Sequence, residues 1–268
     1  MTFRCSAASR EANEQLEGTA PTEPAFLFVE YAGAWTRDAP ALLREHVDIP
    51  EGVRPQLIRR HRLATEGGLR VFAAWRCAVD GADAFTVETT VLDDLTELVS
   101  LDLQALAAGS SPHLTPYDGP LWLVCTNGRR DVCCAELGRP VAAAVTDRWP
   151  ASTWETTHLG GHRFAATLLA LPSGITLGRL DAGSAVAACR EIEAGVHPTS
   201  HSRGRAGLPP AEQALDVHAA RTGVDPASLV VIERPGPLLR MSCADDKQKP
   251  STVFEIHPQS DAGAPPQS

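Results

Sequence analysis

The stretch from residue 154 to residue 164, WETTHLGGHRF, carries the residues of this chain whose types and spacing point most directly to chemistry. His158 and His162 are separated by three residues, and Gly160 and Gly161 lie inside that gap. Each glycine costs roughly 1 kcal/mol relative to alanine inside a helix, so packing alone does not explain two of them here. Two imidazoles at this spacing lie about 6 Å apart on one face of a helical turn, close enough to reach one metal centre.

The stretch CTNGRRDVCC offers thiols that could complete the set. Cys125 is predicted to end a strand, where α/β folds present functional groups to a crevice, and Cys133 and Cys134 to begin the next helix. A helix N-terminus lowers the pKa of a thiol and favours the thiolate, which is the ligating form. Counted from Cys134, the four positions are spaced C-x8-C-x23-H-x3-H. Two thiolates and two imidazoles make a complete four-ligand set.

Three kinds of site fit these residues. A structural zinc ion takes two cysteines and two histidines in a closed tetrahedral shell. A [2Fe–2S] cluster can take two cysteines on one iron and two histidines on the other. Spacing does not separate these two, although a zinc finger usually pairs its cysteines more closely. The third possibility is a thiol oxidoreductase that uses the vicinal Cys133 and Cys134, but it lacks a C-x-x-C motif, and adjacent cysteines form a strained ring when bridged.

Composition and charge indicate the class of protein and exclude some kinds of partner. The chain has 268 residues, 43% hydrophobic and 21% charged, which is ordinary for a soluble globular protein, and no apolar run is as long as a membrane span. Its polar amino terminus lacks the apolar core of a signal peptide, so we predict a cytoplasmic protein. A net charge of −9 argues against nucleic acid as a partner. Seven irregularly placed cysteines favour buried thiols plus a metal site over disulfides.

The hydrophobic pattern alternates between strands and helices, which predicts an α/β fold. We expect helices over 39–47, 95–109, 135–149, from Phe164 onward, 182–195 and 210–223. We expect strands over 25–33, 70–79, 84–92, 121–128, 152–157, 174–180, 228–233, 238–243 and 252–257. A break rich in proline and glycine near residue 116 cuts the chain into two parts.

A weak internal repeat suggests how the two parts are related. FLFVEYAG (26–33) and LWLVCTNG (121–128) both give a strand of large apolar residues and a short loop that ends on glycine. We therefore predict an N-terminal arm over 1–23, a degenerate subdomain over 24–115, a metal-binding subdomain over 116–258 and a disordered tail over 259–268.

The motifs together resemble the sucrase/ferredoxin-like family and the thioredoxin-like ferredoxins. The resemblance is carried by CTNGRRDVCC, WETTHLGGHRFAATLLALPSG, LGRL, CSAASREANEQLEGTAP and RGRAGLP, and HLGGHRFA is the most specific part. It implies two tandem thioredoxin-like ferredoxin units, the first degenerate. It also implies that Cys125, Cys134, His158 and His162 hold a [2Fe–2S] cluster, with Cys133 as a packed thiol or a substitute ligand beside them.

The resulting prediction is an iron–sulfur protein for electron transfer or redox sensing. We expect an electron carrier more than a stand-alone catalyst, with no catalytic residues of its own. No G-x-G-x-x-G fingerprint is visible, so electrons would come from a separate redox partner protein or reductase. Paired carboxylates cannot be placed on a common surface, which disfavours glycoside hydrolysis despite the word sucrase. The zinc-stabilised interaction module and the thiol oxidoreductase remain alternatives, and the oligomeric state stays open.

Overall fold

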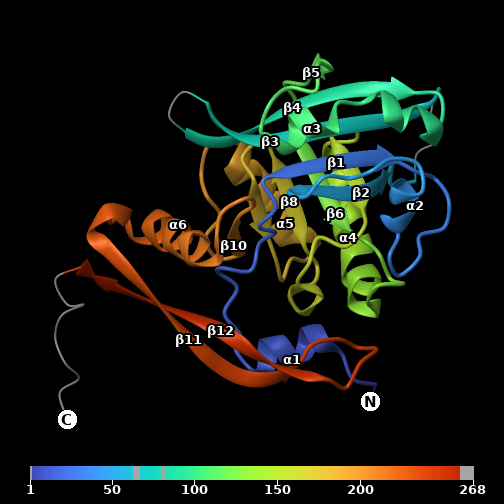
Figure 1. Ribbon diagram of the computed structural model, residues 1–268. Coiled ribbons are helices and arrows are strands. Elements are labelled where there is room, and N and C mark those ends of the chain that lie inside the picture. Colours follow the sequence, from blue (N-terminus) through green and yellow to red (C-terminus); the bar gives the residue numbers. More distant parts are fainter. Residues whose placement is uncertain (1, 63–66, 80–81, 260–268) are drawn as a thin grey trace, which may run out of the picture.

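One large sheet organises the molecule. The computed structural model describes residues 2–62, 67–79 and 82–259. Ten strands form a sheet in the order β10-β9-β8-β6-β7-β2-β1-β3-β4-β5, and β11 and β12 form a separate hairpin (Figure 1). Most neighbouring strands of the sheet are antiparallel, but β1 and β2 are parallel, as are β6 and β7. With helices packed on this mixed sheet, the predicted α/β class is confirmed.

The amino-terminal part of the chain supplies one half of the sheet. Its elements are α1 (Cys5–Glu11), β1 (Ala25–Glu30), α2 (Ala41–Arg44), β2 (Val53–Arg59), β3 (Leu69–Val79), β4 (Ala82–Leu92), the 3-10 helix η1 (Leu95–Ser100), α3 (Leu103–Ala107) and β5 (Thr115–Pro116). All six residues of β1 are buried, because β2 and β3 flank it and apolar side chains cover both of its faces.

The carboxy-terminal part supplies the other half and the hairpin. Its elements are β6 (Leu121–Cys125), α4 (Val132–Arg148), β7 (Thr153–Thr156), the 3-10 helix η2 (His162–Phe164), β8 (Leu168–Leu171), β9 (Ile175–Leu177), α5 (Ala182–Glu193), β10 (Ser202–Arg205), α6 (Pro210–Thr222), the 3-10 helix η3 (Pro226–Ser228), β11 (Leu229–Arg240) and β12 (Gln248–Pro258). The central strand β6 is buried along its whole length between β7 and β8.

The two halves repeat one arrangement of strands. In each, a strand, a helix and a parallel strand come first (β1-α2-β2 and β6-α4-β7), and two antiparallel strands follow on the other side of the first strand. The halves join where β2 pairs with β7, at Ile58 with Thr156 and Arg59 with Glu155. This topology agrees with the weak sequence repeat. The boundaries 24–115 and 116–258 stay a prediction, since one continuous sheet carries both parts, and the predicted tail after residue 259 lies outside the described residues.

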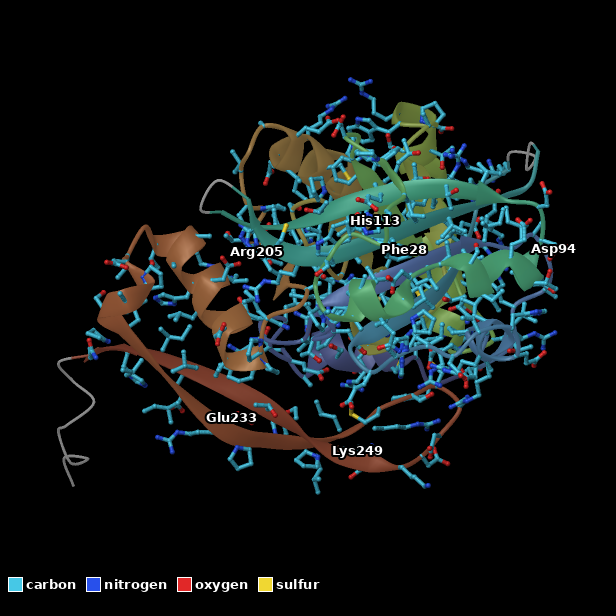
Figure 2. The ribbon with its side chains drawn as sticks, turned by 45° about the horizontal axis from the view of Figure 1, so that its top comes forward. Phe28, Asp94, His113, Arg205, Glu233 and Lys249 are labelled. Carbon is cyan, nitrogen blue, oxygen red and sulfur yellow. The ribbon has the colours of Figure 1, made fainter. Side chains whose placement is uncertain are left out.

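Alternation along the strands divides the core between the two faces of the sheet. On β1, Phe26 and Phe28 join a cluster that reaches across the junction to Trp154, Cys125 and Cys134, whereas the intervening side chains pack toward α2 and α3. Phe28 lies in the interior of the body in Figure 2. The cluster shared by both halves thus contains the two predicted cysteine ligands.

Several elements differ from the sequence prediction, which also lacks α1, β5 and β10. The helix expected from Phe164 onward is wrong: η2 ends at Phe164, and residues 168–171 form the buried strand β8. A short run of apolar residues buried on both faces has no periodicity that separates strand from helix. Strand β2 was not predicted, because Pro55 and two arginines interrupt its apolar pattern.

Other boundaries shift for local reasons. The helix expected over 95–109 is divided into η1 and α3, because the Asp102 carboxylate accepts a hydrogen bond of 2.9 Å from the backbone N–H of Ala105 and starts a new helix. The helix expected over 39–47 is only four residues long, and the three strands expected after residue 228 are two long ones.

The hairpin of β11 and β12 forms an outer layer of the molecule. Its strands extend away from α6, and Glu233 and Lys249 mark its outer position (Figures 1 and 2). The connection between the strands contacts α1, where the backbone N–H of Cys5 lies 3.3 Å from Cys243 Sγ. Phe254 is 6% exposed, and its backbone N–H donates to the side-chain oxygen of Gln15 at 2.7 Å. The connection between the strands, residues 241–247, reaches the histidine loop described next, since the carbonyl oxygen of Met241 lies 2.6 Å from His162 Nε2.

Candidate metal centre

The loop between β6 and α4 brings two thiols together. Cys125 is the last residue of β6, and the Asp131 carboxylate caps α4 by accepting from the backbone N–H of Cys133 at 3.0 Å. A Cβ atom on Gly138 would lie 2.1 Å from the carbonyl oxygen of Cys125, so this glycine lets α4 approach the end of β6. As a result the side chains of Cys125 and Cys134 lie together, each only 1% exposed.

The two histidines do not share the helical turn that the spacing suggested: His158 lies in a loop and His162 begins η2. Gly160 and Gly161 have φ angles of +83° and +63°, in the left-handed region that glycine adopts most readily. A Cβ atom on Gly161 would lie 2.4 Å from the guanidinium of Arg203, so this position has no space for a side chain. This glycine turn places the imidazoles of His158 and His162 with ring centroids 5.1 Å apart.

Three of the four predicted ligands form one group, and His162 lies beside it. The ligating atoms of Cys125, Cys134 and His158 all lie within 4.8 Å of one another. Cys134 Sγ is 3.9 Å from His158 Nδ1, and His158 Nε2 is 3.3 Å from His162 Nδ1. His162 therefore joins the group through His158. This arrangement can bind a metal that prefers sulfur and nitrogen.

A carbonyl group from the hairpin orients His162. Its Nε2 lies 2.6 Å from the carbonyl oxygen of Met241, and since a carbonyl only accepts, Nε2–H is the donor. That tautomer leaves Nδ1 free of a proton and able to ligate, as is usual for metal-binding histidines. Burial, together with the neighbouring His158, lowers the pKa of His162 and favours its neutral form.

The two thiols share their protons unequally. The hydrogen bond from Cys134 to Cys125 stabilises a thiolate on Cys125 and holds its pKa well below the usual value, although burial opposes this. The same hydrogen bond, with burial, raises the pKa of Cys134 far above the usual value. The pair therefore loses one proton easily and a second only when a cation compensates the two adjacent negative charges.

Residues outside the predicted set hold the histidine loop in place. Arg203 is 1% exposed and donates to the carbonyl oxygen of Gly160 at 3.2 Å and to Thr19 Oγ1 at 3.0 Å. Burial lowers the pKa of Arg203 to about 9, and Arg54 adds to the shift, while Cys125 and Cys134 oppose it. RGRAGLP marked this segment in the sequence, but nothing there indicated which arginine contacts the loop.

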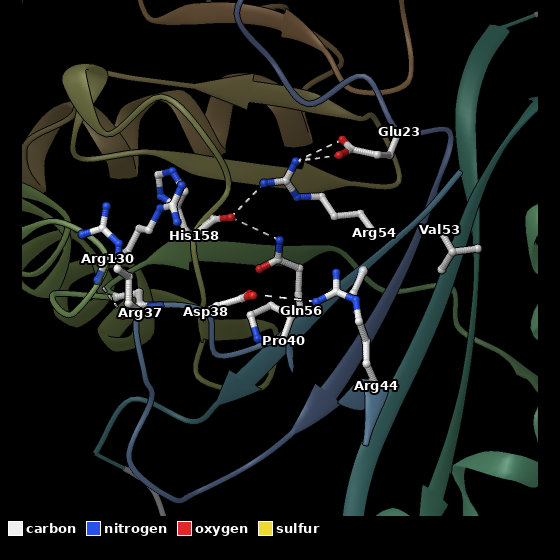
Figure 3. Close-up of a pocket in the computed structure, with 12 residues that line it drawn as sticks. Glu23, Arg37, Asp38, Pro40, Arg44, Val53, Arg54, Gln56, Arg130 and His158 are labelled. Atoms are coloured by element: carbon white, nitrogen blue, oxygen red, sulfur yellow. Dashed lines mark hydrogen bonds and ion pairs between the residues drawn. The ribbon is translucent and has the colours of Figure 1, made fainter. Parts of the chain in front are cut away.

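A polar cavity of about 300 Å³ leads to the edge of the site. Its lining includes His158 and four arginines, Arg37, Arg44, Arg54 and Arg130, with only two acidic residues, Glu23 and Asp38. Figure 3 shows the carbonyl group of His158 at one side of this cavity, where it accepts from Arg54 Nη2 at 2.9 Å and from Gln56 Nε2 at 3.3 Å. The cavity thus gives solvent and anionic groups access to the site.

The adjacent thiols Cys133 and Cys134 belong to different groups. Cys134 contacts His158, whereas Cys133 Sγ lies 3.7 Å from Cys5 Sγ and 3.4 Å from Cys243 Sγ. This divergence follows from the angle of about 100° between successive side chains on a helix. It argues against the two residues acting as a vicinal pair.

One comparison with known proteins identifies a family for this chain. The profile of the sucrase/ferredoxin-like family matches residues 7–204, which is well over half of the chain. The chain belongs to the sucrase/ferredoxin-like family. Searches of curated proteins and of solved structures gave no significant match. Membership of this family, with the grouped cysteines and histidines, indicates a redox or metal-related role.

The family match of this sucrase/ferredoxin-like protein does not cover both groups of cysteines. Its family match ends before α6 and the hairpin, so Met241 and Cys243 lie outside the matched region, as does Cys5 at the other end. In the part of the chain that the structure describes, no helix is long and apolar enough to cross a membrane.

Proposed function

We propose that this protein transfers electrons or senses redox state with a [2Fe–2S] cluster held by Cys125, Cys134, His158 and His162. The observation that carries the proposal is the grouping of two buried thiols with His158, and of His162 beside His158, in a member of a ferredoxin-like family. Such a cluster, when bound, supplies one-electron chemistry. The donor set fits it, with two sulfur ligands and two nitrogen ligands.

The chain's own residues would tune this chemistry. Neutral imidazoles in place of thiolates leave less negative charge on the iron, so this ligand set gives potentials of roughly −150 to +300 mV, against about −400 mV for plant-type ferredoxins. The hydrogen bond from His162 Nε2–H to Met241 fixes the orientation of that ring. The second ring nitrogen of each ligating histidine can lose a proton more easily when the iron is oxidised, which couples electron transfer to pH.

The cavity beside His158 suggests how a redox partner approaches. Glu23 pairs with Arg54 at 3.0 Å, but among the described residues no carboxylate forms an ion pair with Arg37 or Arg130. These cations could dock an acidic surface or an anionic group of a separate reductase near the exposed edge of the site. The partner would then reach the centre through His158, and not through the buried cysteines.

Metal analysis tests the proposal. The full chain purified without oxygen should contain about two irons and two acid-labile sulfides, absorb visible light, and show an electron paramagnetic resonance signal after reduction. Cys125→Ser, Cys134→Ser and His158→Ala should each lose most of the iron, whereas His218→Ala, on α6, should keep it. A colourless wild-type protein after reconstitution with iron and sulfide would refute the cluster.

Zinc is the second candidate for the same residues, and one observation favours it. Ligating atoms of Cys125, Cys134 and His158 within 4.8 Å of one another suit a single tetrahedral ion. The protein would then be a zinc-stabilised interaction module, which chelators unfold and which has no redox signal. Zinc that survives in the wild type but is lost in His158→Ala, in the absence of iron, would establish this alternative.

A further inference from the structure

A second group of metal-binding side chains lies beside the first and takes no part in the proposed function. Cys5 comes from α1, Asp131 and Cys133 from the start of α4, and Cys243 from the connection between β11 and β12. The ligating atoms of these four residues all lie within 4.8 Å of one another. Three segments that are distant in the sequence therefore converge on one point.

The distances within this group suit a single metal ion. Cys133 Sγ lies 3.7 Å from Cys5 Sγ and 3.4 Å from Cys243 Sγ, and Cys5 Sγ lies 3.5 Å from Asp131 Oδ1. In a tetrahedral zinc site with bonds of about 2.3 Å to sulfur and 2.1 Å to oxygen, two sulfurs are about 3.8 Å apart, and a sulfur and an oxygen about 3.6 Å. A disulfide needs a distance of about 2.05 Å, and the cysteines are free in this structure.

The buried position of these four donors favours binding of a cation. Cys5, Cys133 and Asp131 are 0%, 1% and 2% exposed, and Cys243 is partly covered. Thiols and a carboxylate packed this closely repel one another as they ionise, and the surrounding protein screens that repulsion poorly. A divalent ion would compensate the negative charges and release the thiol protons on binding.

The surrounding hydrogen bonds already orient the donors. The Asp131 carboxylate accepts from the backbone N–H of Cys133 at 3.0 Å through Oδ1, and from that of Cys243 at 2.9 Å through Oδ2. Ser6 Oγ lies 3.2 Å from Cys133 Sγ, and the backbone N–H of Cys5 points to Cys243 Sγ at 3.3 Å. Bonds of this kind fix metal ligands and stabilise thiolates.

We propose that Cys5, Cys133 and Cys243, with the Asp131 carboxylate, bind one Zn²⁺ in a closed structural site. Four protein ligands leave no open position for a substrate. The ion would fasten α1 and the hairpin connection to the start of α4, and so hold Met241 against His162. The site shares no ligand with the cluster, although Met241 links the two. Both Cys5 and Cys243 lie outside the region that the family profile matches.

Zinc and iron measured in the same samples test this site. The full chain, purified with zinc sulfate in the medium, should carry one zinc per chain. Cys243→Ser and Cys5→Ser should lower the zinc content at least tenfold and leave the iron content unchanged, because neither residue is a ligand of the cluster. Cys77→Ser is the matched control, because Cys77 is a partly buried free thiol on β3, and this variant should keep its zinc.

Each other outcome has a defined meaning. Wild-type protein without zinc, or zinc retained in both Cys5→Ser and Cys243→Ser, overturns the site. A disulfide between Cys133 and Cys243, detected by counting thiols in the unfolded protein, overturns it as well. Zinc that disappears in His158→Ala but not in Cys243→Ser belongs to the first centre and defeats both the cluster and this second site.

A stability measurement covers the case in which a variant folds poorly. EDTA should lower the thermal midpoint of the wild type, and added Zn²⁺ should restore it. Cys243→Ser, whose substitution lies in an exterior connection, should have a midpoint that EDTA does not change. If the wild-type midpoint is also insensitive to EDTA while its zinc is removed, the ion has no structural role and the proposal fails.

Discussion

At the scale of single residues, the two imidazoles decide what kind of redox centre the proposed cluster would be. Replacing His158 or His162 by cysteine supplies a thiolate, which adds negative charge near the iron. We expect each variant to keep its iron and to have a potential lower than the wild type by on the order of 100 mV or more. The dependence of the potential on pH should also weaken, because fewer ring protons remain. Potentiometric titration followed by electron paramagnetic resonance, at several pH values, measures both effects.

The comparison has an internal control. Cys125→Ser replaces a soft ligand by a poor one, and should lose iron instead of shifting the potential. If the histidine-to-cysteine variants keep the wild-type potential and its pH dependence, the histidines are not ligands of the redox centre.

Gly161 shows how a single backbone position supports the site. An alanine there would adopt a left-handed conformation, and its Cβ would collide with the buried guanidinium of Arg203. We expect Gly161→Ala to lower the free energy of unfolding by about 3 kcal/mol, from roughly 1 kcal/mol of backbone strain and a larger cost of displacing packed groups. Gly195 also has a positive φ of +76°, but a Cβ atom there would have no neighbour within 4 Å, so Gly195→Ala isolates the strain.

Denaturant unfolding of both glycine variants, with metal analysis of the folded proteins, measures these effects. Gly195→Ala should cost about 1 kcal/mol and leave the metal content unchanged. Equal losses in the two variants would mean that the contact between Gly161 and Arg203 does not constrain the loop.

At the scale of elements, His197 links the segment after α5 to β10 and α6. Its side chain is 7% exposed, and its Nε2 lies 2.7 Å from Ser202 Oγ. Burial lowers the pKa of His197 to about 4, although the nearby Asp216 opposes the shift. The folded pKa is below the unfolded value of about 6.5, so the stability that depends on neutral His197 is complete above pH 6.5 and is lost as the pH falls to 4. The difference between the folded and unfolded pKa values corresponds to about 3 kcal/mol of unfolding free energy.

His197→Gln should remove this part of the acid sensitivity. Glutamine stays neutral and can still bond Ser202, so the difference in unfolding free energy between variant and wild type should change by about 3 kcal/mol between pH 7 and pH 4. Chemical denaturation at intervals of half a pH unit gives the two curves. Parallel curves over that range would show that His197 is not the group that titrates.

The elements that the sequence predicts correctly are those that local pattern determines. The end of β6 at Cys125 and the start of α4 near Cys133 follow from an apolar run, a turn and a capping aspartate. Packing in a helix did not explain the two glycines between the histidines, and both have left-handed φ angles in the structure. These local signals selected the two loops, and the family resemblance decided between Cys133 and Cys134 as the predicted ligand.

Contacts between distant segments account for what the sequence did not reveal. The carbonyl of Met241, the guanidinium of Arg203 and the thiol of Cys5 reach the two groups of donors only through tertiary folding. Neither spacing nor composition ties these residues to the histidine loop. The strand β8 was predicted as a helix for a related reason, because burial between two neighbouring strands removes the alternation that marks a strand.

At the scale of the whole molecule, one half of the sheet carries the candidate ligands and the other half supports them. Glu30 ends β1 as Cys125 ends β6, so the first half has a carboxylate where the second has a thiol. Arg54 and Gln56 of β2 nevertheless hold the carbonyl group of His158. The first half supplies no ligand to the proposed cluster but fixes the position of the histidine loop, so the cluster site depends on the junction of the two halves.

Glu155 is the main polar link at that junction, where β2 and β7 pair over only a short length. Its carboxylate is 6% exposed, and lies 2.8 Å from Arg59 Nη2, 2.6 Å from His61 Nδ1 and 2.7 Å from Thr126 Oγ1. Burial alone would raise the pKa of Glu155, but these hydrogen bonds, first that from Thr126, bring it below the usual value. The carboxylate is therefore stabilised as an anion in a buried position.

Glu155→Gln tests whether the halves form one cooperative unit. The amide keeps the size of the side chain but loses the charge, which leaves Arg59 without its buried partner, so we expect a loss of about 2–4 kcal/mol in the free energy of unfolding. Glu255→Gln removes an exposed ion pair with Arg234 on the hairpin and should produce no resolvable change in the free energy of unfolding.

If the two halves depend on each other, circular dichroism and tryptophan fluorescence should follow one transition in the wild type, and the iron should be released in that same transition. In Glu155→Gln the transition should shift to lower denaturant concentration as a whole, because Arg54 and Gln56 cannot hold the histidine loop once the junction opens. Two separate transitions in the wild type, with iron retained after the first, would show instead that the second half folds and binds metal without support from the first.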